Sequence, residues 1–185
     1  VGPMLAQHGN EWIHSEIVPK ILAGELCIAI GYSEPGAGTD LAALKTSAVR
    51  DGDEWVINGQ KMWTSLANFS DYVWLAVRTD PDAPKRKGIS YFLLDMTTPG
   101  VEVRPIRNAV GDSHFCEIFL NDVRIPAANL VGEENRGWQV AQATLTYGYD
   151  GVELRGKERQ HVSPEFTAGE RAAVRRLFAG SGLAI

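Results

Sequence analysis

The sequence predicts an α+β fold in which a central antiparallel β-barrel or sandwich is flanked by helices. Residues 71–77 and 89–94 are runs of aromatic and branched side chains of strand length. Similar runs follow at 101–106 and 115–120. Turn signals separate these runs, which is typical of barrels and sandwiches. The segment that precedes residue 25 instead has apolar residues at helical spacing.

The first elements are expected in the following order. Residues 1–24 should be helical and divided in two by Pro19, because proline removes a backbone donor. Residues 26–30 form a short apolar run that predicts a buried strand. Residues 54–57 and 60–64 flank Asn58-Gly59, the dipeptide that signals a β-hairpin most strongly, so we expect a tight turn there.

The later connections are also predicted from local composition. Residues 80–88 are rich in proline and charge and should form an exposed loop. Their basic cluster could meet a phosphate or a partner, although a solvated loop is the simpler interpretation. Gly137-Trp138 opens a helical pattern, and a capping box at 167–170 predicts a last helix that ends near Gly180.

Composition excludes several classes of function. The chain has 185 residues and a net charge of -5, so it carries no basic footprint for nucleic acid. No apolar run approaches the ~18 residues of a membrane span, and no leader is visible, so a cytoplasmic location is expected. Cys27 and Cys116 stand in apolar surroundings and are expected to be reduced and buried. The four histidines lack metal-ligand spacing, and no metal is assigned.

Two segments have the composition of a ligand site. Residues 32–40 form a turn rich in glycine and hydroxyl groups, whose backbone N–H groups could approach an anion closely. It is not a dinucleotide fingerprint, because Leu41 stands where the third glycine is needed. The simpler alternative is a surface turn in which Asp40 caps the following residues. Residues 58–65 bring Trp63 beside hydroxyl groups, which suits a flat ring system with polar edges, such as a flavin.

These segments resemble the acyl-CoA dehydrogenase family. Residues 33–40 (SEPGAGTD), 58–65 (NGQKMWTS) and 122–126 (DVRIP) are similar to its signature segments, in the same order. The resemblance implies that residues 1–24 end an N-terminal helical domain and that residues 25–132 form the β-barrel domain that binds FAD and acyl-CoA. It also implies that residues 133–185 begin an incomplete or divergent C-terminal helical domain, so that the chain is a fragment of the full fold.

The resemblance further implies a reaction and a site. Members of the family use FAD to desaturate an acyl-CoA thioester between the α and β carbons, and an electron-transferring flavoprotein reoxidises the flavin. They form oligomers, so a homo- or hetero-oligomer is expected. Thr39 corresponds to a contact with acyl-CoA, and Trp63 to the residue that covers one face of the flavin. The residues that correspond to flavin contacts are Ile30, Tyr32, Ser33, Gly38, Thr39, Trp63, Thr64 and Ser65.

Two departures from the family pattern leave questions open. Ser65 replaces the threonine expected near the flavin N5, and Thr64 replaces an apolar residue and could take the same role. No catalytic base is assigned, because Asp150, Glu153 and Glu158 lie near the expected region but match no motif. A non-catalytic partner subunit that binds flavin or acyl-CoA, and an acyl-CoA oxidase, remain alternatives. Fatty, branched and steroid side-chain thioesters are all open as substrates.

Overall fold

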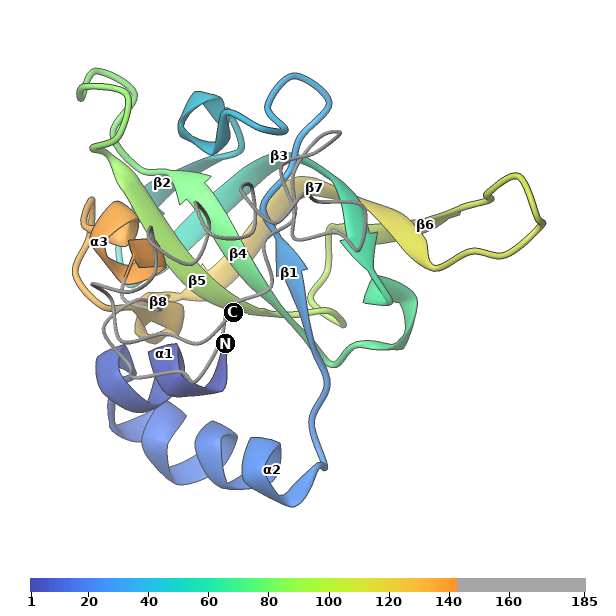
Figure 1. Ribbon diagram of the computed structural model, residues 1–185. Helices are drawn as coiled ribbons and strands as arrows, with labels where there is room; N and C mark the ends of the chain where they lie inside the picture. Colours follow the sequence, from blue (N-terminus) through green and yellow to red (C-terminus); the bar gives the residue numbers. More distant parts are fainter. Residues whose placement is uncertain (143–185) are drawn as a thin grey trace, which may run out of the picture. The chain divides into compact units, whose positions relative to one another are not determined.

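The computed structural model describes residues 1–142 (Figure 1). Its helices are α1 (Gly2–His8), a π-helical turn (Ile13–Ile17), α2 (Val18–Ala23) and α3 (Gly137–Gln142). Its strands are β1 (Ile28–Gly31), β2 (Ser47–Asp51), β3 (Glu54–Ser65), β4 (Tyr72–Arg78), β5 (Ile89–Asp95), β6 (Val101–Ile106), β7 (Phe115–Pro126) and β8 (Leu130–Val131). Short 3-10 turns lie at Leu41–Ala43, Ala67–Phe69 and Ala127–Asn129.

The strands form one eight-stranded sheet in the order β6-β7-β3-β2-β4-β5-β8, and β1 lies beside β4. Most neighbours are antiparallel, whereas β1 runs parallel to β4, and β2 meets β4 at the single parallel pair Ser47–Arg78. The strands predicted at 71–77, 89–94, 101–106 and 115–120 correspond to β4, β5, β6 and β7. The predicted α+β class is therefore confirmed, while β2 had not been predicted.

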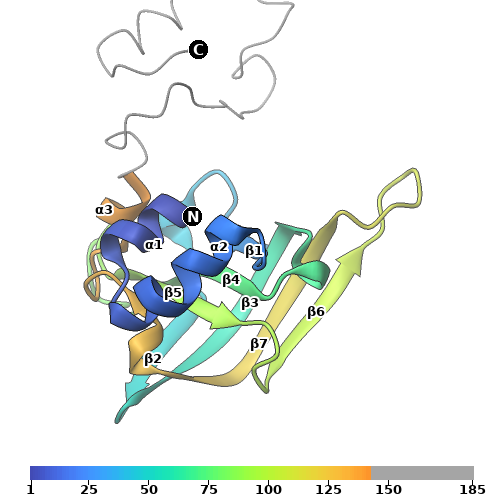
Figure 2. The same ribbon diagram turned by 90° about the horizontal axis from the view of Figure 1, so that it is seen from below.

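The sheet curves so that one face encloses a core. Trp55 on β3 meets Phe92 on β5 edge to face, with ring centroids 5.2 Å apart. Ile118 of β7 and Leu75 of β4 are fully buried in the same cluster. Helices α1 and α2 lie against the side of the sheet that carries β4 and β5 (Figure 2). Strand β5 is therefore buried almost throughout, which explains its continuous apolar sequence.

The helical segment breaks at a different place from the one predicted. The chain leaves α1 at Gly9-Asn10 and is then helical from residue 11 to residue 23. The Asn10 side chain accepts a hydrogen bond from the Ile13 amide at 3.1 Å and so starts the second helical segment. Pro19 lies in the first turn of α2, directly after the π-helical turn, where its missing N–H is tolerated. The prediction that Pro19 breaks the helix was wrong.

The predicted hairpin at Asn58-Gly59 was also wrong. Both residues lie inside the continuous strand β3, and the turn occurs instead at Gly52-Asp53, between β2 and β3. Gly52 has φ 62°, as the first central residue of such a turn often does. Asn58 pairs with Asp122 on β7 through two hydrogen bonds of 3.0 and 2.9 Å, where the β3–β7 register shifts.

The two cysteines differ in exposure. Cys116 on β7 is buried as predicted, but Cys27 is exposed, so that half of the prediction was wrong. Strand β1 begins only at Ile28, and Cys27 lies in the preceding connection, where its backbone amide donates to Asp71 at 2.8 Å. Neither cysteine forms a disulfide. Within residues 1–142, none of the helices has both the length and the apolar character that a membrane crossing needs.

Candidate functional site

The two ligand-like segments lie next to each other in the fold. Residues 32–40 continue from β1, and residues 58–65 belong to β3. The Met62 amide donates to the Ser33 carbonyl at 2.8 Å, which joins the segments through their backbones. Two stretches that are about 25 residues apart in the sequence are thereby brought into one region.

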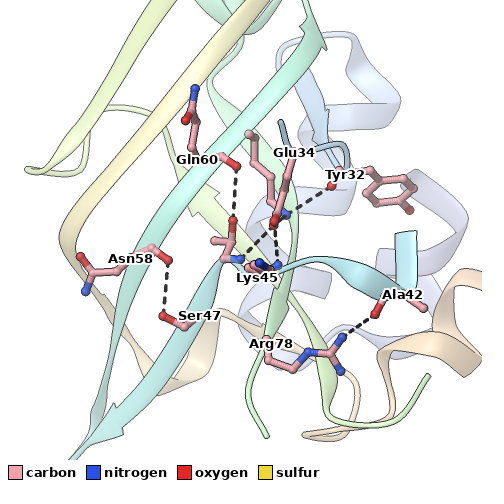
Figure 3. Close-up of polar contacts among 10 residues, drawn as sticks. Tyr32, Glu34, Ala42, Lys45, Ser47, Asn58, Gln60 and Arg78 are labelled. Carbon is pink, nitrogen blue, oxygen red and sulfur yellow. Dashed lines mark hydrogen bonds and ion pairs between the residues drawn. The ribbon is translucent and has the colours of Figure 1, made fainter. Parts of the chain in front are cut away.

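A buried ion pair joins the same two segments (Figure 3). Lys61 Nζ lies 2.8 Å from Glu34 Oε1, and the Lys61 side chain is 0% exposed. Lys61 Nζ also donates to the Tyr32 carbonyl at 3.3 Å. The Glu34 carboxylate accepts the backbone amides of Lys45 at 2.6 Å and Thr46 at 2.9 Å. One carboxylate thus connects the glycine-rich turn, the approach to β2 and strand β3.

The environment shifts the pKa of both members of this pair. Burial lowers the pKa of Lys61 to about 8, although the Glu34 carboxylate acts in the opposite direction. Burial alone would raise the pKa of Glu34, but the Lys61 charge and three hydrogen bonds outweigh it and lower that pKa. Glu34 is therefore a carboxylate at neutral pH.

The turn itself is closed by its backbone. The Glu34 amide donates to Ala37 O at 2.9 Å, and the Ala37 amide donates to Glu34 O at 3.1 Å. Gly36 and Gly38 have no positive φ, and a Cβ built on either would meet no atom within 4 Å. Neither the backbone conformation nor the packing of residues 1–142 therefore requires glycine there. A close approach by a bound group would account for both glycines.

Strand β3 presents Trp63 to solvent. Trp63 has φ 61°, which is unusual for a bulky residue, and the β3–β7 register shifts between Lys61 and Thr64. The Trp63 side chain is 56% exposed and meets Phe115 edge to face at 6.3 Å. Strained backbone of this kind often occurs where a protein handles a ligand.

The two hydroxyl residues after Trp63 differ in their surroundings. Thr64 is 1% exposed, and its Oγ1 has no hydrogen-bond partner among residues 1–142. Ser65 is exposed, as Trp63 is. The sequence left the choice between these two hydroxyls open, and only Ser65 shares the exposed character of Trp63.

The remaining predicted site residues fall into two groups. Ile30 is 48% exposed, Ser33 is half-buried, and Gly38 and Thr39 are exposed. The Tyr32 hydroxyl instead accepts a hydrogen bond from Trp74 Nε1 at 3.0 Å, and its ring lies 5.7 Å from that of Tyr91. Burial raises the pKa of Tyr32. The Tyr32 side chain is thus engaged in the aromatic core.

Further contacts fix the connection after the turn. Asp40 forms an ion pair with Lys85, and it makes no side-chain cap to the 3-10 turn that follows it. Arg78 donates to Ala42 O at 2.7 Å and to Lys87 O at 2.6 Å, which ties the predicted loop 80–88 to this turn. The sequence reasoning did not identify the roles of Glu34, Lys61 and Arg78.

Several sequence predictions lie outside the described residues. The possible bases Asp150, Glu153 and Glu158 and the predicted last helix all lie beyond residue 142. The helix predicted to open at Gly137-Trp138 corresponds to α3.

Comparison with known proteins identifies the family. Residues 29–123 match the family model "Acyl-CoA dehydrogenase, middle domain". The chain belongs to the acyl-CoA dehydrogenase family. It is 52% identical over 145 residues to acyl-CoA dehydrogenase FadE29 of Mycobacterium tuberculosis, a match that covers 78% of this chain and 38% of that protein.

Solved structures agree with this family membership. The fold is similar to that of the Tcur3481-Tcur3483 steroid ACAD, with a TM-score of 0.75 and 48% identity over 78% of this chain and 37% of that one. It is also similar to a chain of the ChsE4-ChsE5 complex from Mycobacterium tuberculosis, with a TM-score of 0.73, 48% identity and the same coverage. The chain therefore spans well under half the length of the relatives that it matches.

Proposed function

We propose that this chain supplies part of the flavin and acyl-CoA site of an FAD-dependent acyl-CoA dehydrogenase, which introduces a double bond between the α and β carbons of an acyl-CoA thioester. The single observation that carries the proposal is the direct connection between the glycine-rich turn and the Trp63 segment, made by the Met62–Ser33 hydrogen bond and the Lys61–Glu34 pair.

Three features of residues 1–142 fit a bound flavin. Gly36 and Gly38 leave open space where any side chain would stand. Trp63 exposes an aromatic surface on a strained backbone. Ser65 offers an exposed hydroxyl on the same strand segment. When bound, FAD supplies the acceptor for the hydride that leaves the β carbon.

The residues of the chain take the following roles in this proposal. Trp63 covers one face of the flavin and keeps water away from it. Ser65, rather than the buried Thr64, donates a hydrogen bond to the polar edge of the ring. Ser33 and the backbone N–H groups around Gly38 contact the flavin and its pyrophosphate. Thr39 donates to the acyl-CoA.

The surroundings of Tyr32 and Ile30 decide how each of them can meet the flavin. The inward placement of the Tyr32 side chain leaves its backbone as the part that can meet the flavin. Ile30 offers an exposed apolar side chain on β1 that can pack against the ring. No residue between 1 and 142 is proposed as the carboxylate that removes the α-proton. We propose that this base comes from another segment of the protein.

Substrate and partners follow from the relatives. Similarity to the steroid ACAD makes CoA thioesters of steroid side chains the first substrates to test, ahead of fatty and branched acyl-CoA. An electron-transferring flavoprotein is proposed as the electron acceptor. Assembly with a second, different chain is the favoured oligomer, because a similar structure is that of a two-protein complex. In such an assembly this chain could be the non-catalytic subunit, which is the alternative to an active dehydrogenase.

An anaerobic visible spectrum of the full-length protein with FAD tests the proposal. Addition of a panel of steroid, fatty and branched acyl-CoA thioesters should bleach the flavin band for at least one class. Bound flavin that no thioester bleaches would favour the non-catalytic subunit, and protein that binds no flavin would refute the proposal. Oxygen consumption by the reduced protein, measured without the flavoprotein, would instead identify an oxidase.

A further inference from the structure

The Glu34–Lys61 pair links the two chain segments that carry groups proposed to meet the flavin. Ser33 directly precedes Glu34 in the turn, and Trp63 follows Lys61 by two residues on β3. The ion pair therefore ties together the two backbone segments that carry these contacts.

The contacts around the pair leave little freedom. Glu34 is 7% exposed, and its two carboxylate oxygens receive three donors, namely Lys61 Nζ and the amides of Lys45 and Thr46. Lys61 divides its N–H groups between Glu34 and the Tyr32 carbonyl. Because charged groups accept hydrogen bonds more strongly than neutral ones do, this carboxylate fixes three chain segments relative to one another.

Stability alone is a weak reason for such a pair. A buried ion pair can often be replaced by apolar residues of similar volume without loss of stability, because the removal of two charges from water is costly. The pair is therefore better explained by the geometry that it imposes. Its two members belong to the turn and to β3, the two segments of the proposed flavin site.

We propose that Glu34 and Lys61 are positioning residues, which hold Ser33 and Trp63 at the separation that the flavin requires. This inference rests on the proposed function. The pair itself touches neither the flavin nor the substrate, and it acts through the Met62–Ser33 backbone hydrogen bond that lies beside it.

The test compares two variants in the full-length protein. Lys61→Met/Glu34→Gln removes both charges while it nearly keeps the volume of each side chain. The matched control Arg104→Met/Glu102→Gln removes an exposed ion pair of 2.7 Å on β6 by analogous substitutions, a basic residue to methionine and a glutamate to glutamine. Each variant is measured for its urea unfolding midpoint, the hydrogen exchange of the Met62 amide without flavin, its dissociation constant for FAD and the visible absorption maximum of the bound flavin.

The inference predicts a specific pattern. Glutamine has one acceptor oxygen where Glu34 has two, and the Lys45 and Thr46 amides use both of them, so the Lys61→Met/Glu34→Gln variant should have a somewhat lower unfolding midpoint. Under conditions in which it is fully folded, it should exchange the Met62 amide faster and bind FAD about tenfold or more weakly. The flavin that remains bound should have a shifted absorption maximum, whereas the control should match the wild type. A purely structural pair would lower the midpoint and leave the affinity and the absorption maximum of the folded protein unchanged, which would overturn the inference.

The remaining outcomes are also decisive. If the double variant does not fold, Glu34→Gln alone carries the same measurements. It leaves the buried Lys61 without its counter-charge, so its midpoint should fall further, and the test is its affinity for FAD and the absorption maximum of the bound flavin under conditions in which it is folded. Equal affinity of the wild type and of Glu34→Gln for FAD would overturn the inference and leave the proposed function intact. Wild-type protein that binds no FAD would overturn the proposed function, and with it the inference.

Discussion

Replacement of Gly59 by alanine should strongly destabilise the protein. Gly59 lies in the middle of β3 with φ 151°, and a Cβ built there would stand 2.6 Å from Thr46 Oγ1 and 2.7 Å from Thr46 Cα. Non-bonded carbons normally rest about 3.5–4.0 Å apart, so the backbones must separate by about 1 Å. Thr46 Cα belongs to the main chain and cannot rotate away.

The cost has two parts. An alanine in this backbone conformation costs about 1–3 kcal/mol. Displacement of Thr46 also weakens its amide hydrogen bond to the Glu34 carboxylate, 2.9 Å long, which is worth about 1.5–3 kcal/mol because the acceptor is charged. The sum is about 2.5–6 kcal/mol, and at about 2–4 °C per kcal/mol for a protein of this size the Tm should fall by about 5–24 °C.

Two other glycines provide matched controls for urea unfolding followed by circular dichroism. Gly36→Ala introduces neither a clash nor a positive φ and should change the free energy of unfolding by less than about 0.5 kcal/mol. In Gly52→Ala the new methyl group meets no atom of residues 1–142 within 4 Å, but alanine is placed at φ 62°, so the change should cost about 1–2 kcal/mol. If Gly59→Ala were no less stable than Gly52→Ala, the explanation from close strand approach would be refuted.

Three further predictions concern the site. Thr64→Val removes a buried hydroxyl that has no partner within the described part of the chain and should raise the free energy of unfolding by about 1–3 kcal/mol in urea titrations; a decrease would contradict this. Gly38→Ala should leave stability within about 0.5 kcal/mol of wild type. It should nevertheless weaken FAD or acyl-CoA binding about tenfold in calorimetry, and unchanged affinity for both would count against close ligand approach. The pKa of Lys61 is lowered to about 8 from 10.5, so between these values the unfolded chain binds more protons and stability rises with pH. Between pH 8 and pH 10.5, the free energy of unfolding of the wild type should rise by up to about 3 kcal/mol relative to that of Lys61→Met/Glu34→Gln, as measured by urea unfolding. If the difference between the two proteins did not change with pH, the lowered pKa of Lys61 would be disproved.

Strands with a strong local pattern were predictable from the sequence. Strands β4 and β5 are buried on both sides of the sheet, so their sequences are nearly continuous apolar runs. The end of β6 at Ile106 and the start of β7 at Phe115 coincide with the predicted boundaries. Each of these strands is determined mainly by the burial of its own side chains, and the apolar pattern of a single sequence shows which side chains are buried.

The turn between β2 and β3 was missed because two local signals competed. Gly52-Asp53 is also a hairpin dipeptide, of the type with glycine at the first central position, and it could have been chosen from the sequence. Gly59 is instead required by its approach to Thr46, which is 13 residues away in the sequence. A contact between strands of this kind leaves no mark in the residues next to Gly59.

The types of residue at the site were predictable, but their orientations were not. The shift in register between Lys61 and Thr64 decides that Trp63 and Ser65 are exposed and that Thr64 is buried. The Tyr32 side chain turns inward because Trp74 offers it a hydrogen bond from a neighbouring strand. Both outcomes depend on partners from strands that a local pattern does not include.

Lys61 did leave a signal in the sequence. In β3 the buried side chains alternate with exposed ones, and Trp55, Ile57 and Lys61 stand at positions of the same parity. A lysine on the core-facing side of a strand requires a partner of opposite charge, because an isolated buried ammonium is too costly. Glu34, an acidic residue inside the glycine-rich turn, meets that requirement. A lysine at a core-facing position thus predicts that β3 contacts an acidic segment elsewhere in the chain. The combination of Lys61 and Glu34 therefore predicts, from the sequence alone, that the Trp63 segment and the glycine-rich turn lie side by side.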